Sequence, residues 1–363
     1  GTGSLCLFSN TIDILGTLPE GMEMKEGLSQ WIKGHPEHPY SKLDWEKIEQ
    51  ALSSFRSVFQ SQYTFQSVEH QNCLIPTGAG TYRPTYLIPS TMTAGTSLKN
   101  GKVLIVGFKG FKDFYTDYTA DQLKCRGIVI PLSEFPGQEM VATAIARLME
   151  RGSFREVLGR EVKKRMEGES RIGFPALLGI RDPLKVKKNL EEIIGVEVFE
   201  IPLLPPSIPG MRIFRHFKEW LIQRGVTFLL GHSVLKANLN GKRCEGIEVS
   251  HPPLSQSYSA DRFILATGRF IGGGLKADHE KIFEPLFNLS VLQPGARDHW
   301  FANSFFNGHP IHQAGILTDF SFRPTDERGE RVVENVWIAG SVLAGHDCIR
   351  EKSREGIEIA TGY

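Results

Sequence analysis

Short apolar runs alternate with helical segments through the middle third of the chain. The runs are residues 102–108, 127–132, 171–180 and 196–202, and helices are expected at 111–126, 137–151, 154–167 and from Asp182. Runs of this length are typical of strands buried on both faces, and Asp182 followed by proline is a good helix start. Strand–helix alternation predicts a parallel sheet covered by helices, so this part of the chain is expected to be α/β.

Two later apolar runs stop abruptly at a glycine. Residues 263–266 precede Thr267-Gly268 and a triple glycine at 272–274, and residues 336–339 precede Gly340-Ser341. We expect both to be buried strands. A strand that ends this way exposes backbone N–H groups at the edge where open α/β sheets bind ligands, and glycine lets a flat cofactor approach the backbone. The pattern predicts a cofactor cleft; the simpler alternative is a flexible turn after each strand.

The remaining pattern is less regular. A strand or apolar loop is expected at 4–16, interrupted at Ser9-Asn10, and a connector rich in Pro, Gly and His at 17–43. A helix should begin near Ser41, a hairpin should turn at Asn240-Gly241, and a last helix should begin at about Ser353.

Two proline-rich segments have both a structural and a functional interpretation. Residues 72–92 form either a hairpin or a loop that presents Thr77, Thr81 and Arg83 to a ligand, where Arg83 could fork onto a phosphate or carboxylate. Residues 201–215 form either a crossover or a rigid loop before a helix that starts at Gly210. In the second case Arg212 on the first turn would help bind an anion.

Composition narrows the classes of function. The 363 residues carry a net charge of +1 with basic residues spread along the chain, which does not point to nucleic acid. The five cysteines are far apart without ligand spacing, so no disulfide framework, zinc site or iron–sulfur site is indicated, and a reducing cytoplasm fits. No apolar run approaches a membrane span, so any membrane association would go through a partner. Because the chain opens at Gly1 without methionine, we expect it to be a piece of a longer protein.

Several of these segments together resemble a known family. The pair ILATG (264–268) and NVWIAGSVLAG (335–345) resembles the later cofactor-contacting segments of two-domain flavoproteins of the fumarate reductase kind. The stretches at 75–87, 201–212 and 265–275 narrow the resemblance to the B subunits of the anaerobic glycerol-3-phosphate dehydrogenases.

The resemblance implies a fold, a reaction and partners. The fold would be an FAD/NAD(P)-binding-like three-layer domain at 1–100 and 225–363, with an inserted α/β domain at 101–224. The activity would be an oxidoreductase one: a flavin, FMN or FAD, would take part in the oxidation of glycerol 3-phosphate to dihydroxyacetone phosphate, with electrons passed toward quinone. A larger flavoprotein subunit and an iron–sulfur subunit would tie the cytoplasmic chain to the inner face of the membrane.

The resemblance also suggests site residues. Ser9, Asn10, Gly340 and Ser341 would contact the edge of the flavin ring, and Thr267 and Gly268 would line its ribityl or phosphate side. The family's last loop near the cofactor can be glycine-rich; here it reads REKSREG (350–356), and Gly356 is the glycine that would contact the cofactor. Arg83 would lie on the substrate or partner side. His346-Asp347 is the nearest candidate for acid–base chemistry, or else caps the terminal helix.

Two departures keep other functions open. The Gly-rich turn with which the family begins is not found among the residues from Gly1 on, and the last loop, which can be glycine-rich in the family, keeps only Gly356. The chain could therefore be a scaffold subunit without flavin. A free-standing flavin oxidoreductase for another small substrate is the other alternative.

Overall fold

The computed structural model describes residues 4–7, 9–59, 63–96, 98, 101–132 and 139–363. The chain forms two compact units. Unit 1 comprises Asp13–Phe55 and Phe228–Tyr363, and unit 2 comprises the chain up to Ile12 and Arg56–Thr227. The predicted division into domains at residues 100 and 224 stays a prediction.

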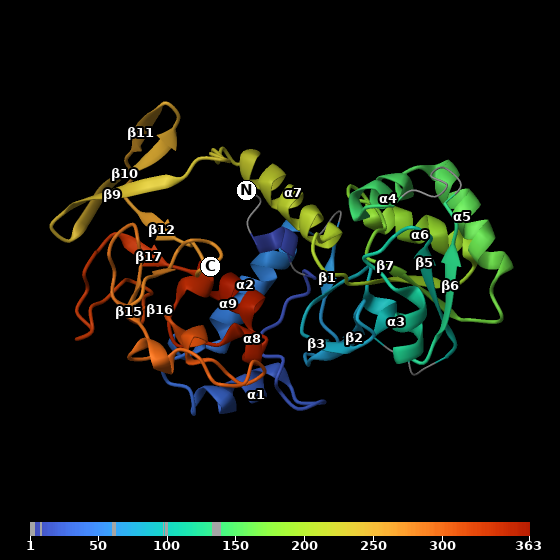
Figure 1. Cartoon of the computed structure of the whole chain (residues 1–363), viewed down its shortest axis with the longest axis horizontal. Helices are drawn as coiled ribbons and strands as arrows, with labels where there is room; N and C mark the ends of the chain where they lie inside the picture. Colours follow the sequence, from blue (N-terminus) through green and yellow to red (C-terminus); the bar gives the residue numbers. More distant parts are fainter. Residues whose placement is uncertain (1–3, 8, 60–62, 97, 99–100, 133–138) are drawn as a thin grey trace. The chain divides into compact units, whose positions relative to one another are not determined.

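Unit 2 is built on a parallel sheet of four strands in the order β6-β5-β7-β8. The strands are β5 Val103–Phe108, β6 Arg126–Ile130, β7 Arg171–Pro175 and β8 Glu197–Ile201. The connecting helices are α3 Thr116–Gln122, α4 Ala142–Met149, α5 Gly152–Lys164 and α6 Pro183–Ile194. Helix α3 lies on one face of the sheet, and α5 and α6 lie on the other (Figure 1). The predicted α/β class is confirmed.

Local interactions explain why some ends of these strands and helices match the prediction and others do not. Every residue of β5 is buried, as its apolar run indicated. The Asp182 carboxylate accepts the Lys185 N–H at 3.1 Å and Pro183 occupies the first turn, so α6 begins where expected. The helix predicted at 111–126 is shorter than expected, because Phe111 makes a β-bridge with Met140 and α3 begins only at Thr116.

Two small antiparallel strand pairs and one long helix also belong to unit 2. Strands β2 Cys73–Pro76 and β3 Tyr82–Thr85 pair antiparallel, which confirms a hairpin at 72–92. Strands β1 Phe65–Gln66 and β4 Ile88–Pro89 also pair. Helix α7, Ile208–Ile222, begins before the predicted Gly210, because the Ser207 hydroxyl accepts the Gly210 N–H at 3.0 Å and caps it. Short 3-10 helices cover Ser4–Leu7 and Thr93–Gly95.

Unit 1 begins with helices that differ from the prediction. The expected connector at 17–43 contains α1, Met24–Ile32, with Met24, Gly27 and Leu28 buried on one face, and a 3-10 turn, Pro39–Lys42. Helix α2, Trp45–Val58, starts after Asp44 rather than near Ser41. The Asp44 carboxylate accepts the Lys47 N–H at 2.8 Å and is the cap.

The strands of unit 1 form small sheets. Strands β9 Val234–Asn240, β10 Arg243–His251 and β11 Leu254–Tyr258 form an antiparallel meander, whose first turn confirms the hairpin predicted at Asn240-Gly241 (Figure 1). Strands β12 Phe263–Leu265 and β17 Val336–Ile338 pair in parallel. The shorter pairs are β13 Lys276–Ala277 with β14 Ile282–Phe283, and β15 Val291–Leu292 with β16 Gly315–Ile316.

Short helices follow β17 and close the chain. They are the 3-10 turn Gly340–Val342, α8 Cys348–Glu351 and α9 Arg354–Gly362. Two more 3-10 turns cover Arg297–His299 and Pro310–Gln313. Helix α9 begins one residue after the predicted start at Ser353. Leu265, Trp300, Ile316, Val336 and Ile338 belong to the buried core beneath these elements.

Candidate functional site

Two glycine-terminated strands of unit 1 lie side by side. Strands β12 and β17 run parallel with Leu265 opposite Ile338, and the Ala339 N–H donates to the Leu265 carbonyl at 3.1 Å. Thr267-Gly268 and Gly340-Ser341 therefore leave the same edge. A Cβ added to Gly268 would lie 3.7 Å from the Ser341 hydroxyl oxygen. The structure thus brings together four of the residues predicted to contact a cofactor.

The strand before Gly268 is not buried on both faces, which corrects the prediction. Leu265 packs into the core, but Ile264 is 69% exposed. A short apolar run fits a strand with one buried face as well as one with two, so the run alone could not distinguish them.

The backbone at both strand ends adopts a conformation that favours glycine. Gly268 and Gly340 have φ angles of +70° and +78°, which favour glycine. An added Cβ would find its nearest heavy atom 3.7 Å away at Gly268, and 3.5 Å away, the Glu358 Cγ, at Gly340. The Gly340 N–H is already used, since it donates to the Thr361 hydroxyl at 2.8 Å. Neither added Cβ would collide with protein atoms, so the glycines at the two strand ends are compatible with a flavin, and Gly340 itself is buried.

The triple glycine serves the turn itself, contrary to the prediction that it admits a cofactor. A Cβ at Gly272 would collide with the Thr267 carbonyl oxygen, and one at Gly274 with the Gly268 carbonyl oxygen. Gly273 differs, because it has a φ of +79° and a Cβ there would meet no heavy atom within 4 Å. Two of the three glycines therefore let the turn fold back onto Thr267-Gly268.

Arg269, which the sequence analysis did not single out, connects this edge to its surroundings. One guanidinium nitrogen donates to the His312 carbonyl, and another donates to the carbonyls of Leu343 and His346 at 3.2 and 2.8 Å. The Arg269 carbonyl accepts the Gly274 N–H at 3.1 Å. In the sequence, the feature that could have pointed to Arg269 is its position directly after Thr267-Gly268.

His346 and Asp347 have different partners. The His346 side chain is fully buried and lies within 3.2 Å of the Arg269 guanidinium. Burial first, and then the Arg269 and His38 charges, hold the pKa of His346 well below its usual value. Asp347 accepts the N–H groups of Ile349 and Arg350 and lies 3.4 Å from His312. Asp347 therefore caps α8 and not the terminal helix α9, and no hydrogen bond between the two side chains is seen in the described residues.

The Glu351 carboxylate on α8, close to His346-Asp347, accepts several hydrogen bonds. The Glu351 carboxylate accepts hydrogen bonds from His38 at 3.2 Å, the Ser353 hydroxyl at 2.9 Å and the Asp347 N–H at 2.8 Å. His38 Nδ1 accepts the Tyr40 N–H, so its Nε2 carries the proton that it donates. Burial acts to raise the pKa of Glu351, but these hydrogen bonds outweigh it and the pKa is lowered.

Two residues of α9 bear on the site in different ways. Gly356 is buried against the chain itself: an added Cβ would collide with the Tyr40 hydroxyl and lie 2.8 Å from the Ile14 Cα. Its place in the structure is a close helix contact. Glu358, which was not predicted, is half-buried under Gly340, and burial raises the pKa of its carboxyl group.

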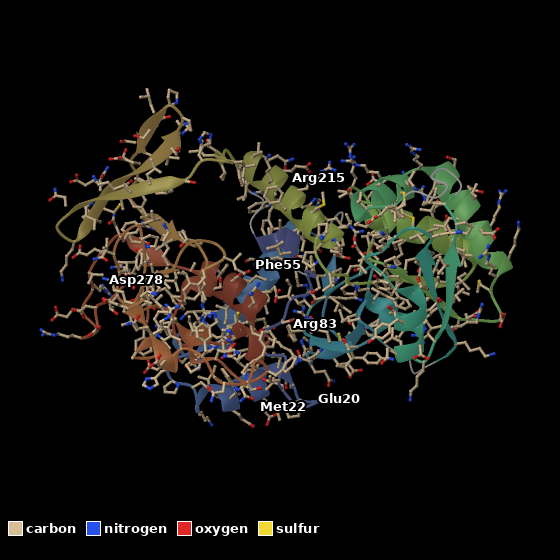
Figure 2. The ribbon with its side chains drawn as sticks, in the orientation of Figure 1. Glu20, Met22, Phe55, Arg83, Arg215 and Asp278 are labelled. Atoms are coloured by element: carbon tan, nitrogen blue, oxygen red, sulfur yellow. The ribbon has the colours of Figure 1, made fainter. Side chains whose placement is uncertain are left out.

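The other predicted contacts lie in unit 2. The Ser9 hydroxyl is 3.1 Å from that of Thr11. Asn10, with a φ of +60°, donates from its amide to the Leu5 carbonyl at 3.0 Å and to the Ser207 hydroxyl at 3.3 Å. Arg83 is half-buried on β3 (Figure 2), opposite Ile75. That these three residues share a site with the residues of unit 1 stays a prediction.

Arg212, a candidate for anion binding, is occupied inside the protein. Its guanidinium makes two bonds of 2.7 Å to the Glu200 carboxylate and one of 2.8 Å to the Gly179 carbonyl. Both side chains are buried, and the arginine lies over the Tyr63 ring. Burial raises the pKa of Tyr63 to about 12. The prediction of an external anion here is wrong, because an internal carboxylate takes its place.

Neither a metal site nor a membrane span is found in the part of the chain that the structure describes. Within it, no three His, Cys, Asp or Glu side chains gather in a way that could hold a metal ion. No described helix combines the length and the apolar character needed to cross a membrane.

Comparison with known proteins shows which family and which proteins the chain is similar to. Residues 2–354 match the family described as FAD binding domain. The chain is 31% identical to a protein of Halobacterium salinarum named as a probable B subunit of anaerobic glycerol-3-phosphate dehydrogenase, over 98% of this chain and 87% of that protein. It is 28% identical to the corresponding B subunit of Vibrio cholerae, over 100% of this chain and 88% of the relative. The B subunit of Actinobacillus pleuropneumoniae is also 28% identical, over 99% of this chain and 90% of the relative.

No solved structure matches the chain. The sequence matches extend over nearly its whole length, and they confirm the resemblance that its glycine-terminated strands indicated. The chain belongs to the FAD-binding oxidoreductase family that includes the B subunits of the anaerobic glycerol-3-phosphate dehydrogenases.

Proposed function

We propose that this chain is the flavin-carrying B subunit of an anaerobic glycerol-3-phosphate dehydrogenase. In this function, electrons from the oxidation of glycerol 3-phosphate to dihydroxyacetone phosphate pass through the complex toward quinone. The observation that carries the proposal is the pair of positive-φ glycines in Thr267-Gly268 and Gly340-Ser341, side by side at the carboxyl ends of parallel strands. The names of the relatives support the substrate.

The chain's own residues would bind and orient the cofactor. Gly268 and Gly340 leave room for the ring, and the Ser341 hydroxyl and the Thr267 backbone would supply polar contacts along it. Ser9 and Asn10 stay proposed ring-edge contacts. FAD is favoured over FMN by the family match. When bound, a flavin supplies a two-electron acceptor, which none of the amino-acid side chains provides.

Substrate and partner contacts are also part of the proposal. Arg83, His346 and Asp347 stay candidates for the substrate side, and Gly356 for the loop near the cofactor. The word subunit in the relatives' names supports the presence of partner subunits. We propose that these are the larger flavoprotein subunit and the iron–sulfur subunit that the resemblance implies. Through them the chain would associate with the inner face of the membrane from the cytoplasm.

Spectroscopy of the full-length protein tests the proposal. We expect an absorption band at about 450 nm, typical of oxidised flavin, and release of FAD rather than FMN on denaturation. In the assembled complex, glycerol 3-phosphate should bleach the band without added cofactor. Absence of this absorption band would favour the alternative of a scaffold subunit without flavin. Bleaching of the band in the isolated chain by a different substrate would favour the free-standing oxidoreductase.

A further inference from the structure

The turn after β12 and the turn after β17 are held by one side chain. The Arg269 guanidinium donates to the carbonyls of His312, Leu343 and His346, which belong to two separate segments of unit 1. Three main-chain carbonyls would otherwise need partners, and arginine is the side chain whose planar array of N–H groups can satisfy several at fixed angles.

The same residue also closes the turn on its own strand. Its carbonyl accepts the Gly274 N–H, while Gly272 and Gly274 pack against Thr267 and Gly268. Thr267-Gly268 is therefore held from its carboxyl side by a residue anchored across to the β17 turn. The β17 turn is itself fastened to the β16 segment, since the Ala344 N–H donates to the Ile316 carbonyl at 3.2 Å.

We propose that Arg269 is a positioning residue that holds the Thr267-Gly268 and Gly340-Ser341 backbones in the mutual arrangement that receives the flavin. The inference rests on the proposed function and assigns a task to a side chain that need not touch the cofactor. Lysine cannot replace it, because a single ammonium group cannot span three carbonyls in a fixed geometry.

The test compares Arg269→Met and Arg269→Lys with the matched control Arg297→Met in the full-length protein. Arg297 is also in unit 1 and donates to one carbonyl, that of Asp278, at 2.8 Å. Two quantities are measured: the dissociation constant for FAD by fluorescence titration, and hydrogen–deuterium exchange of the flavin-free protein.

We expect both Arg269 variants to bind FAD roughly tenfold or more weakly, because a displaced binding edge loses preorganisation. Exchange should quicken in residues 267–274 and 340–346 while the β9–β10 hairpin stays as protected as in wild type. Arg297→Met should change neither quantity. A purely structural role would instead speed exchange throughout unit 1 and leave the affinity of the folded protein unchanged.

The possible outcomes separate the two proposals. FAD binding by wild type with unaltered affinity in both Arg269 variants overturns the positioning role and leaves the proposed function standing. If wild type binds no flavin, the proposed function and the positioning role toward the flavin are both overturned. If wild type binds FAD, weaker binding by the Arg269 variants together with faster exchange confined to the two turns supports the positioning role, and unchanged exchange refutes it. Arg269→Lys keeps the test available if Arg269→Met does not fold.

Discussion

Gly268 has a backbone conformation that favours glycine, and it also lies at the proposed flavin site. Substitutions can separate the effect of backbone strain from the effect on flavin binding. Valine at a φ of +70° is strained by about 1–3 kcal/mol. Gly268→Val should therefore lower stability and also abolish flavin retention, because its side chain enters the open space beside Ser341. Gly273→Val, at a φ of +79° with open surroundings, controls for strain and should keep the flavin. The flavin-to-protein absorbance ratio measures the difference; equal ratios in the two variants would show that the site is elsewhere.

His346 makes the stability of the protein sensitive to acid. Its pKa in the folded state lies well below the ordinary 6.5, so below pH 6.5 the unfolded imidazole gains a proton that the folded one does not. The free energy of unfolding should therefore fall with pH below 6.5, by at most about 1.4 kcal/mol per pH unit. His346→Gln should remove this slope, while His279→Gln, at an exposed position, should keep it. Urea unfolding at a series of pH values gives the slopes, and identical slopes in His346→Gln and wild type would refute the assignment.

At the scale of elements, Gly356 sets how closely α9 approaches the Asp13-Ile14 segment. Alanine normally favours a helix by about 1 kcal/mol over glycine. At Gly356 the added Cβ would meet the Tyr40 hydroxyl and the Ile14 Cα, so we expect a net loss of about 1–3 kcal/mol. Gly362→Ala, in the same helix with no heavy atom within 4 Å, is the control and should be neutral or stabilising. The midpoints of denaturant unfolding compare the Gly356→Ala and Gly362→Ala variants. Equal midpoints would mean that the neighbours of Gly356 shift to accommodate the added Cβ without loss of stability.

The Arg212–Glu200 pair connects the start of α7 to the end of β8. Arg212→Met leaves a buried carboxylate without its cation and should lower the free energy of unfolding by about 3–5 kcal/mol. The double variant Arg212→Met with Glu200→Met should recover part of that loss, since no buried charge remains. Arg215→Met (Figure 2) breaks an exposed pair with Glu219 on the same helix, and its expected effect is below about 1 kcal/mol. Chemical denaturation measures all three, and a double variant weaker than the single one would contradict this account.

The elements also show what sequence patterns could predict. The parallel strands of unit 2, the Asp182 cap, the Asn240-Gly241 hairpin and the two glycine-terminated strands themselves follow from local signals. Helix α1 was missed because prolines and histidines nearby obscured one short apolar stripe. Arg212 could not be assigned, since its partner Glu200 lies on another element and a buried carboxylate resembles an external anion. The Arg269 contacts likewise join residues some 40 and 74–77 positions away, which no local pattern reveals.

For the whole molecule, the proposed function requires an exit for electrons. A flavin that has accepted electrons must pass them to another carrier before it can turn over again. The relatives' names describe subunits, which supports a companion protein as that carrier. We therefore expect the tagged full-length chain to co-purify from its source with a second flavoprotein and an iron–sulfur protein.

Reduction kinetics decide whether those companions are functional partners. With the companions present, glycerol 3-phosphate should reduce the flavin of this chain and an added quinone should reoxidise it. With the isolated chain, the same substrate should leave the flavin oxidised if this chain passes electrons on within the complex and a companion subunit oxidises the substrate. Gly268→Val should keep co-purification while losing the signal of its own flavin, so assembly and cofactor binding can be scored separately. Full turnover by the isolated wild-type chain with glycerol 3-phosphate and quinone would contradict the relay role and identify a self-sufficient dehydrogenase.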